Sequence, residues 1–303
     1  MSKTSIEWTE QTWNPIVGCS IVSPGCTNCY AMKMAARIEA MGNQPRYAGT
    51  TRKVNGNTIW TGKLAQAPDS VLLAPLKRKK PTTYFVNSMG DLFHEDCPDE
   101  WIDKVFAVMA LSPQHTFQVL TKRAARMKDY CGRLDSEPHG DTARRIVAAW
   151  PGNAPVPVAG ITFPLPNVWL GVSAERQQEA DERIPLLLQT PAAIRFISAE
   201  PLLGPIDLTV PDIDLGIGRY KSHTDLDWVI VGGESGAKAR FMDQDWARSL
   251  RDQCRSARVP FFFKQWGEWE PGDGDCVGQQ YYKVGKKRAG RLLDGVEHNG
   301  MPS

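Results

Sequence analysis

The residues with the clearest chemistry are three cysteines near the N-terminus. Cys19, Cys26 and Cys29 lie within eleven residues in the spacing C-x6-C-x2-C, and the whole chain has seven cysteines. A loop that gathers three thiols is typical of a site for a soft metal, most often zinc or an iron–sulfur cluster. We therefore expect these three cysteines to be metal ligands.

The surrounding sequence favours ligands over disulfides. The N-terminus lacks the hydrophobic core of a signal peptide, so we expect a cytoplasmic protein whose thiols stay reduced. No apolar run approaches the roughly 20 residues of a membrane span, and we expect no membrane contact. Hydrophobic residues make up 42% and charged residues 23%, as in an ordinary soluble globular protein. A net charge of +2 does not by itself indicate nucleic-acid binding.

The other cysteines leave a zinc alternative open. A structural zinc site normally has four protein ligands in two pairs, whereas this loop offers one pair and one further cysteine. His94 and Cys97 would complete a Cys3His site. Cys254 falls on the apolar face of a predicted helix and is expected in the core. Cys131 and Cys276 have no neighbouring ligand residues.

The elements that must position these groups alternate along the chain. Seven β-rich runs are each followed by polar residues, and most then lead into an amphipathic segment. They lie at 15–18, 83–86, 116–120, 168–172, 194–197, 228–231 and 259–263. Such alternation predicts a parallel sheet with right-handed crossovers, and the nearly all-apolar runs indicate strands covered on both faces. We predict an α/β fold, a partial or full parallel barrel of six to seven strands.

The predicted barrel is one domain over residues 1–303. Insertions are expected at about 43–66, 132–167 and 202–227, with a C-terminal extension over about 268–303. The apolar residues Tyr30, Met34, Ile38 and Met41 predict a helix directly after the cysteine loop. An Asn-Gly turn predicts a small hairpin within 54–60.

Polar groups follow all seven predicted strands. Besides the cysteines they are Ser88 and Asp91, Thr121 and Lys122, Ser173 and Glu175, Ser198 and Glu200, Glu234, and Lys264 with Gln265. Single polar residues at such positions often serve only as helix N-caps. Three glutamates and two lysines fit that explanation poorly. Because the C-terminal ends of barrel strands form the active-site face, these groups predict one large polar site.

Three thiolates would leave one iron of a [4Fe–4S] cluster open to an outside ligand. S-adenosylmethionine (SAM) can bind that iron through its amino and carboxylate groups. An electron from the cluster then cleaves the sulfonium and releases a 5′-deoxyadenosyl radical. In such chemistry the protein supplies binding, orientation and shielding from water.

The sequence resembles a phage- and prophage-associated family of unassigned function, itself similar to a divergent branch of the radical SAM superfamily. The resemblance covers nearly the whole chain. It rests on Thr12-Trp-Asn-Pro15, Gly18-Cys19, Gly25-Cys26-Thr-Asn-Cys29-Tyr30, Asn87-Ser-Met-Gly-Asp-Leu-Phe-His94, Leu120-Thr-Lys-Arg123, Trp169-Leu-Gly-Val-Ser173, Ser198-Ala-Glu-Pro-Leu-Leu-Gly204, Val231-Gly-Gly-Glu-Ser-Gly236, Phe262-Phe-Lys-Gln-Trp-Gly267 and Ala289-Gly-Arg-Leu-Leu-Asp294-Gly. The resemblance implies a radical SAM enzyme with a [4Fe–4S] cluster.

Two departures limit which roles can be carried over. The commonest superfamily spacing is C-x3-C-x2-C with an aromatic residue before the third cysteine, whereas here Tyr30 follows it. The superfamily's Gly-Gly-Glu segment, which holds the SAM amino group, follows the second strand. Here Gly232-Gly-Glu234 follows the sixth, so that role is not assigned to Glu234.

Site roles follow from the resemblance and from strand order. The cluster ligands are Cys19, Cys26 and Cys29. The methionyl end of SAM would face Ser88, Met89 and Asp91, and its carboxylate or ribose would face Lys122, Ser173 and Glu175. The substrate pocket would be lined by Glu200, Glu234, Lys264 and Trp266. Glu234 and Lys264 form a candidate acid–base or ion-pairing set, because burial would shift their pKa values. A salt bridge without a catalytic role is the alternative for that pair.

The substrate class rests on context. The phage resemblance and the basic runs at 77–80 and 286–288 favour a small-molecule or nucleic-acid substrate, such as a nucleotide or a modified base, although such runs are often only solvated surface. We expect a reductase such as a flavodoxin or ferredoxin as electron donor. The alternative function is a non-catalytic zinc- or iron–sulfur-binding module for nucleic acid or a partner protein. Neither the substrate nor the oligomeric state follows from the sequence.

Overall fold

The centre of the fold is a seven-stranded sheet. The computed structural model describes residues 4, 6–136, 148, 161–209, 213–214, 220–221, 225–272 and 281–302. The sheet has the order β1-β6-β7-β8-β9-β12-β13. Its strands are β1 (Gln11–Trp13), β6 (Thr83–Val86), β7 (Thr116–Thr121), β8 (Val168–Ser173), β9 (Ile194–Ala199), β12 (Trp228–Gly232) and β13 (Phe261–Gln265). The pairs β1–β6, β6–β7, β9–β12 and β12–β13 are all parallel.

This sheet confirms the predicted α/β class with a parallel sheet of six to seven strands. Its order runs from β1 to β13 without joining these two strands, which fits the partial form of the predicted barrel. Six strands lie where the sequence placed them, but the first does not. The run at 15–18 forms β2 (Ile16–Val17), which pairs antiparallel with β5 (Ala65–Gln66) outside the central sheet. The first strand of the central sheet is β1, which precedes β2 in the chain and lies at one edge of the sheet. Asn87 Oδ1 accepts the Ile16 N–H at 3.2 Å.

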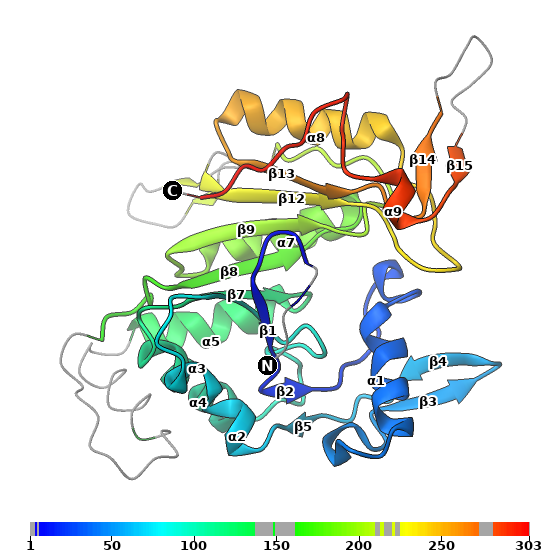
Figure 1. The fold of residues 1–303 in the computed structure, drawn as a ribbon. Helices are drawn as coiled ribbons and strands as arrows, with labels where there is room; N and C mark the ends of the chain where they lie inside the picture. The colour runs from blue at the N-terminus through cyan, green and yellow to red at the C-terminus, as the bar shows by residue number, and fades with distance from the viewer. Residues whose placement is uncertain are drawn as a thin grey trace. The chain divides into compact units, whose positions relative to one another are not determined.

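The remaining elements are helices and small antiparallel ribbons (Figure 1). The helices are α1 (Tyr30–Ala40), α2 (Asp69–Leu72), α3 (Ala74–Lys77), α4 (Asp99–Ala110), α5 (Ala124–Ser136), α7 (Gln177–Gln189), α8 (Gln244–Ala257) and α9 (Lys286–Ala289), with 3-10 turns at Pro24–Cys26 and Pro45–Tyr47. The antiparallel ribbons besides β2–β5 are β3 (Thr51–Val54) with β4 (Asn57–Trp60), β10 (Ile213–Asp214) with β11 (Tyr220–Lys221), and β14 (Trp269–Pro271) with β15 (Tyr281–Lys283).

The chain forms two compact units. The first comprises residues 1–21, 31–171 and 190–193, and the second comprises 22–30, 172–189 and 194–303. The core of the first unit is aromatic. Tyr84 of β6 and Phe117 of β7 stack with ring centroids 5.5 Å apart, and Phe106 of α4 lies 5.3 Å from Tyr130 of α5. The Tyr130 hydroxyl also donates to Asp103 Oδ1 at 2.6 Å, which joins α4 to α5.

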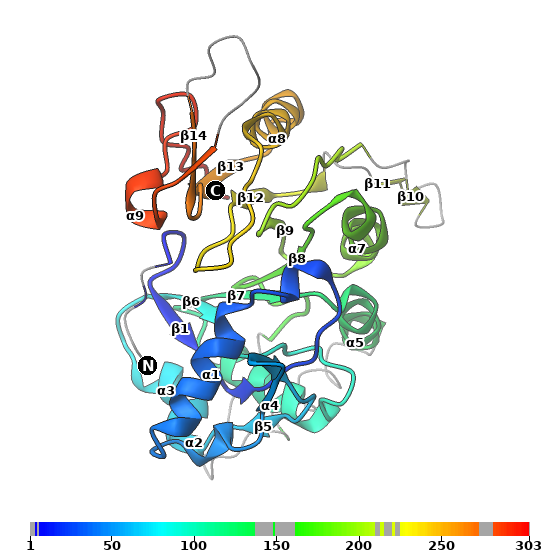
Figure 2. The same cartoon turned by 90° about the vertical axis from the view of Figure 1, so that its right-hand side faces the viewer.

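The second unit carries the later strands. α8 packs against β12 and β13 (Figure 1), and α7 packs beside β9 and β10 (Figure 2). β12 is buried along its whole length, as expected for a parallel strand covered on both faces. Asp243 caps α8 by accepting the Asp245 N–H at 2.8 Å, and Arg258 ends it with a left-handed φ of 58°.

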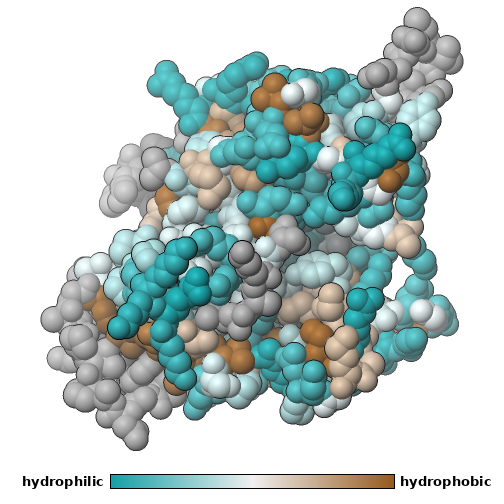
Figure 3. All heavy atoms as spheres, in the orientation of Figure 1, coloured by the Kyte–Doolittle hydropathy of each residue, from teal (hydrophilic) through white to brown (hydrophobic). Residues whose placement is uncertain are grey.

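The helix after the cysteine loop is confirmed as α1, but its buried face differs from the predicted one. Ala31, Met32 and Ala35 are buried, whereas Tyr30 and Met41 of the predicted apolar stripe are exposed. Small side chains and one methionine therefore make the contact with the rest of the protein. Figure 3 shows mainly hydrophilic residues on the face in view, with hydrophobic ones in separate small groups.

The predicted insertions contain the small ribbons. Residues 43–66 hold β3, β4 and β5, including the predicted hairpin, whose turn residues Asn55 and Gly56 have φ values of 48° and 74°. Residues 202–227 hold β10 and β11, and the C-terminal extension holds β14, β15 and α9. Most of 137–160 lies outside the described residues. The single domain over 1–303 stays a prediction. Among the described residues, no helix combines the length and apolar character needed to cross a bilayer.

Candidate functional site

The cysteine loop begins in the first unit and ends in the second. Cys19 belongs to the first unit, while Cys26 and Cys29 belong to the second. Cys26 is buried, and the other two are half-buried. The six cysteines of the described residues form no disulfide. Among the same residues, there is no group of three or more His, Cys, Asp or Glu side chains arranged so that it could hold a metal ion. The first half of the loop, with Cys19, and the second half, with Cys26 and Cys29, therefore each have their own neighbours within one unit.

Gly18 fixes the start of the loop. Its φ is +96°, and its N–H donates to the Met89 carbonyl at 3.1 Å. A Cβ at this position would lie 2.1 Å from the Lys63 carbonyl oxygen. Only glycine fits both the backbone angle and the space. The position of Cys19, directly after Gly18, is therefore fixed relative to β2.

The Cys19 thiol contacts an arginine. Arg123, directly before α5, donates from Nη1 to Cys19 Sγ at 3.4 Å and to Asp91 Oδ2 at 3.0 Å. Its Nε donates to Glu95 Oε2 at 2.9 Å, and its Nη2 donates to Ser20 Oγ at 2.6 Å. Burial opposes the charge of Arg123, but the negative charges of Asp91 and Cys19 outweigh it and raise the guanidinium pKa. A buried, fully positioned cation thus lies beside the first cysteine.

Ser20 connects this arginine to His94 and Glu95. The Ser20 hydroxyl donates to Glu95 Oε1 at 2.9 Å. His94 Nδ1 accepts the Asp96 N–H at 3.1 Å, so the ring proton lies on Nε2, which is 2.9 Å from Ser20 Oγ. Burial opposes ionisation of Glu95, but the Arg123 hydrogen bond and charge outweigh it and lower the Glu95 pKa to about 2. Burial and then the Arg123 charge lower the pKa of His94, which favours the neutral ring.

These contacts do not favour the zinc alternative. Both ring nitrogens of His94 have protein partners, so neither offers a lone pair directed at a metal. Cys97 is 2% exposed, and burial raises the pKa of its thiol to about 12. Zinc binds the thiolate, which this environment disfavours.

The residues predicted to face the methionyl end of SAM lie together in the first unit, but they contact protein groups. Asp91 accepts four hydrogen bonds, from Thr121 Oγ1 at 2.7 Å, Phe93 N at 3.0 Å, Lys122 N at 3.2 Å and Arg123 Nη1 at 3.0 Å. A carboxylate has about four acceptor sites, and here Asp91 uses them to hold Arg123 and the end of β7. Its predicted contact with SAM stays a prediction.

Neighbouring predicted residues are held by Asn14. Its Oδ1 accepts from Ser88 Oγ at 3.2 Å and from Met89 N at 2.9 Å. The Met89 side chain is buried. Lys122 contributes its backbone N–H to Asp91. The predicted contacts of Ser88, Met89 and Lys122 with SAM stay predictions.

The second half of the loop lies against Glu175. Ser23 Oγ donates to Glu175 Oε1 at 2.7 Å and is 3.8 Å from Cys26 Sγ. Arg183 of α7 donates from Nη1 to Glu175 Oε2 at 3.1 Å and to the Ser173 carbonyl at 2.9 Å. Glu175 is fully buried. These groups hold the loop and α7, and the predicted contact of Ser173 and Glu175 with SAM stays a prediction.

The two halves of the loop repeat one arrangement. We call Ser20, Glu95 and Arg123 the first serine–glutamate–arginine set, and Ser23, Glu175 and Arg183 the second. In each set a loop serine donates to a glutamate that pairs with an arginine on or next to a helix. The first set lies beside Cys19 and the second beside Cys26. Such side chains restrict the loop before any ligand binds.

Glu234 also holds the loop. Its carboxylate pairs with Arg240, with Oε1 2.5 Å from Nη2, and Oε2 accepts the Asn28 side-chain amide at 2.9 Å. Arg240 Nη2 also donates to the Pro24 carbonyl at 3.0 Å. Burial opposes ionisation of Glu234, but the Arg240 and Asn28 hydrogen bonds outweigh it and lower its pKa.

The predicted ion-pairing set of Glu234 and Lys264 is corrected. Lys264 Nζ lies 2.6 Å from Glu200 Oε1, and Glu234 pairs with Arg240 instead. The Lys264 and Glu200 side chains are 13% and 20% exposed, so this pair is within reach of solvent. Trp266 is buried and donates its indole N–H to the Leu292 carbonyl at 2.9 Å. Its predicted place in the substrate pocket stays a prediction.

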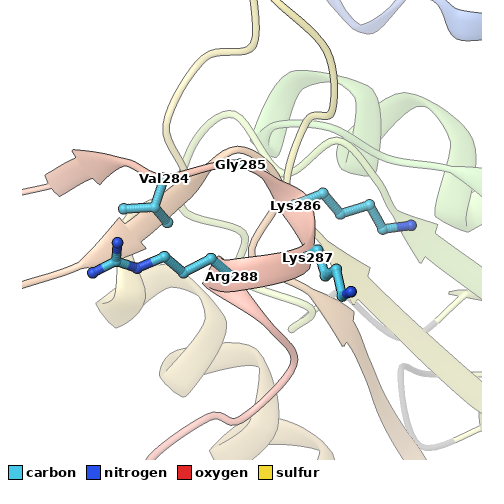
Figure 4. Close-up of a pocket in the computed structure, with 5 residues that line it drawn as sticks. All are labelled: Val284, Gly285, Lys286, Lys287 and Arg288. Atoms are coloured by element: carbon cyan, nitrogen blue, oxygen red, sulfur yellow. The ribbon is translucent and has the colours of Figure 1, made fainter.

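Two surface hollows are lined by residues other than the predicted strand-end groups. One is lined by Val284, Gly285, Lys286, Lys287 and Arg288 (Figure 4). Lys286 and Lys287 point to one side of α9 and Arg288 to the other. The second is lined by Thr209, Ser249, Asp252, Gln253 and Ser256. The basic run at 286–288 is thus at the surface.

Sequence reasoning missed several residues around the loop. They are Ser20, Ser23, Asn28, Glu95, Arg183 and Arg240, and Arg123 was named only within a motif. Arg123 lies two residues after the end of β7, so a second charge beside the predicted Lys122 was a usable signal. Arg183 lies in the middle of α7, where a charged residue usually indicates a solvated face.

One comparison with known proteins gives a match. The model of a family described as "Protein of unknown function (DUF5131)" matches residues 3–302. No curated protein and no solved structure matches the chain.

Proposed function

We propose that this chain, which belongs to the DUF5131 family of proteins of unknown function, is a radical SAM enzyme. Cys19, Cys26 and Cys29 would hold three irons of a [4Fe–4S] cluster, and SAM would take the fourth. With an electron from a flavodoxin or ferredoxin, this cofactor pair supplies a 5′-deoxyadenosyl radical that abstracts hydrogen from the substrate. The observation that carries the proposal is the pair of serine–glutamate–arginine sets built around the loop.

The chemistry of the loop fits three thiolate ligands. Iron–sulfur clusters are held by thiolates, and hydrogen bonds to the sulfurs tune them. Arg123 Nη1 lies 3.4 Å from Cys19 Sγ, and Ser23 Oγ lies 3.8 Å from Cys26 Sγ. In contrast, burial raises the pKa of Cys97, Cys131 and Cys254, which makes these thiols poor ligands. The fold agrees, because the loop follows the first strand of a parallel α/β sheet.

The protein residues have distinct tasks in this proposal. The two sets and Glu234 hold the loop. The residues predicted to face SAM remain Ser88, Met89, Asp91, Lys122, Ser173 and Glu175. The Glu200–Lys264 ion pair, at the ends of β9 and β13, offers a charged and hydrogen-bonding group to a polar substrate. We propose a nucleotide or a nucleic-acid base as substrate, from the phage resemblance and the basic run at 286–288, in which Lys287 and Arg288 are exposed.

Anaerobic purification followed by iron and sulfide analysis tests the proposal. The protein should hold about four irons and four sulfides per chain, and reduction with dithionite in the presence of SAM should release 5′-deoxyadenosine. Cys19→Ser, Cys26→Ser and Cys29→Ser should each lose the brown chromophore.

Two matched variants serve as controls. Cys254→Ser and Cys97→Ser should keep the iron, because both thiols are buried and burial raises their pKa, which disfavours the thiolate that binds a metal. A protein that holds zinc and yields no 5′-deoxyadenosine would overturn the proposal. Loss of metal in Cys97→Ser would instead support a four-ligand zinc site.

A further inference from the structure

We infer that Arg123 is a positioning residue that raises the reduction potential of the cluster by donating to the Cys19 sulfur. This inference rests on the proposed function and adds a regulator of electron entry to it. Arg123 is 8% exposed and lies 3.4 Å from Cys19 Sγ. It belongs to none of the groups that the sequence assigned to SAM or substrate.

The surroundings of Arg123 fix its orientation. A guanidinium presents five N–H donors in a rigid fork. Here Nε donates to Glu95, Nη2 donates to Ser20, and Nη1 is shared by Asp91 and Cys19. Two carboxylates offset the cost of burying the cation. The side chain cannot turn away from Cys19 without breaking several of these hydrogen bonds, so the contact is a fixed feature of the first unit.

The two serine–glutamate–arginine sets differ at the sulfur. In the first set the arginine itself reaches the thiol, at 3.4 Å. In the second set the neutral Ser23 hydroxyl faces Cys26 Sγ, while Arg183 contacts Glu175 and the Ser173 carbonyl. Cys19 is therefore the ligand next to a cationic donor. This asymmetry makes Arg123 the residue to change.

The electrostatic consequence has a definite sign. One electron from the reductase lowers the cluster charge from 2+ to 1+, so the reduced cluster and its thiolates are more negative. A cationic N–H donor stabilises the more negative state, and hydrogen bonds to the sulfurs and net charge are known determinants of cluster potential. Arg123 therefore eases the electron transfer that must precede SAM cleavage, without forming or breaking a bond itself.

An EPR-monitored redox titration of the anaerobically prepared protein tests this inference. Arg123→Gln should shift the midpoint potential to more negative values, while iron per chain stays close to that of the unchanged protein. Arg123→Lys, which keeps the charge but loses the fork, should shift it less. Arg126→Gln is the matched control: Arg126 lies on α5, three residues on, and contacts Asp99 and the Cys97 carbonyl. The midpoint potential of the cluster should not change in the Arg126→Gln variant.

A second variant tests the inference even if the Arg123→Gln protein fails to hold a cluster. Glu95→Gln removes a negative charge beside Arg123 without touching Cys19, so by the same electrostatic argument it should shift the midpoint potential to more positive values. Equal midpoint potentials for Arg126→Gln and for every variant at Arg123 and Glu95 that keeps its cluster would overturn the inference and leave Arg123 with a structural role. The failure of the proposed function is distinguishable, because the unchanged protein would then contain no iron–sulfur cluster to titrate.

Discussion

At the scale of single residues, the carboxylates near the cysteine loop serve to hold the protein together. The sequence placed Glu175 and Glu234 after strands, and the structure confirms those positions. Their partners could not be predicted, because a glutamate after a strand looks the same whether it faces a ligand or an arginine. For Glu175 those partners are Ser23, which lies 152 residues earlier, and Arg183, eight residues later.

Gly25 gives a direct test of this holding role. A Cβ at residue 25 would lie 2.2 Å from Glu175 Oε1, and that carboxylate is fixed by Ser23 and Arg183. Gly25→Ala should therefore destabilise the protein by about 1–3 kcal/mol, the usual cost of overpacking, and lower the iron content. Urea unfolding and iron analysis measure the two effects.

Gly132 provides the matched control. It lies inside α5, and a Cβ there would meet no atom within 4 Å. Gly132→Ala should stabilise the protein by about 0.5–1 kcal/mol through helix propensity. If Gly25→Ala were as harmless as Gly132→Ala, the proposed support of the loop by Glu175 would be wrong.

At the scale of elements, the sequence predicted most of the sheet and helices. Runs such as β6 and β12 are short, apolar and bounded by turn residues, so their local sequence determines them. The first strand was misplaced because Ile16–Val17 is more apolar than Gln11–Trp13. Its place in the sheet depends on pairing with β6, in which Trp13 faces Val86, and that contact is far away in sequence.

The C-terminal extension is another element whose position depends on distant partners. Asp294 Oδ1 pairs with Arg248 of α8 at 2.6 Å, and Arg251 of the same helix also contacts this carboxylate. The hydrogen bonds from Arg248 and then Arg251 lower the pKa of Asp294 below its ordinary value of 3.8. Asp294→Asn removes the charge but keeps a residue that tolerates the φ of 53° found here.

We expect Asp294→Asn to lose up to about 1 kcal/mol of stability at pH 7, since this ion pair is partly exposed. Because the folded-state pKa is lowered, the carboxylate contributes fully above its ordinary pKa, and the contribution disappears as the pH falls through the folded value. Urea unfolding at pH 7 and pH 3 measures the difference. An equal deficit at both pH values would show that the charge is not responsible.

At the scale of the whole molecule, the alternation of strands and helices was enough to predict a parallel α/β sheet. It could not predict the division into two compact units. The chain passes between these units five times, after residues 21, 30, 171, 189 and 193. Neither unit is a continuous segment, and hydrophobic patterning carries no information about such a division.

This connectivity predicts cooperative unfolding. Because β8 contributes residues to both units, opening one unit removes support from the other. Tryptophan fluorescence and far-ultraviolet circular dichroism should therefore give coincident urea transitions. Two separated transitions would mean that the units unfold independently and would contradict the predicted single domain over 1–303.

The Ser23–Glu175 hydrogen bond has a consequence for the order of events during synthesis. Ser23 leaves the ribosome 152 residues before its partner. At a translation rate of about 5–20 residues per second, Cys26 waits about 8–30 s before the second set can form. During that interval the thiols are open to oxidants and to the wrong metals. Loading of the loop should therefore follow the synthesis of α7, and cells short of iron should accumulate chains damaged at these cysteines.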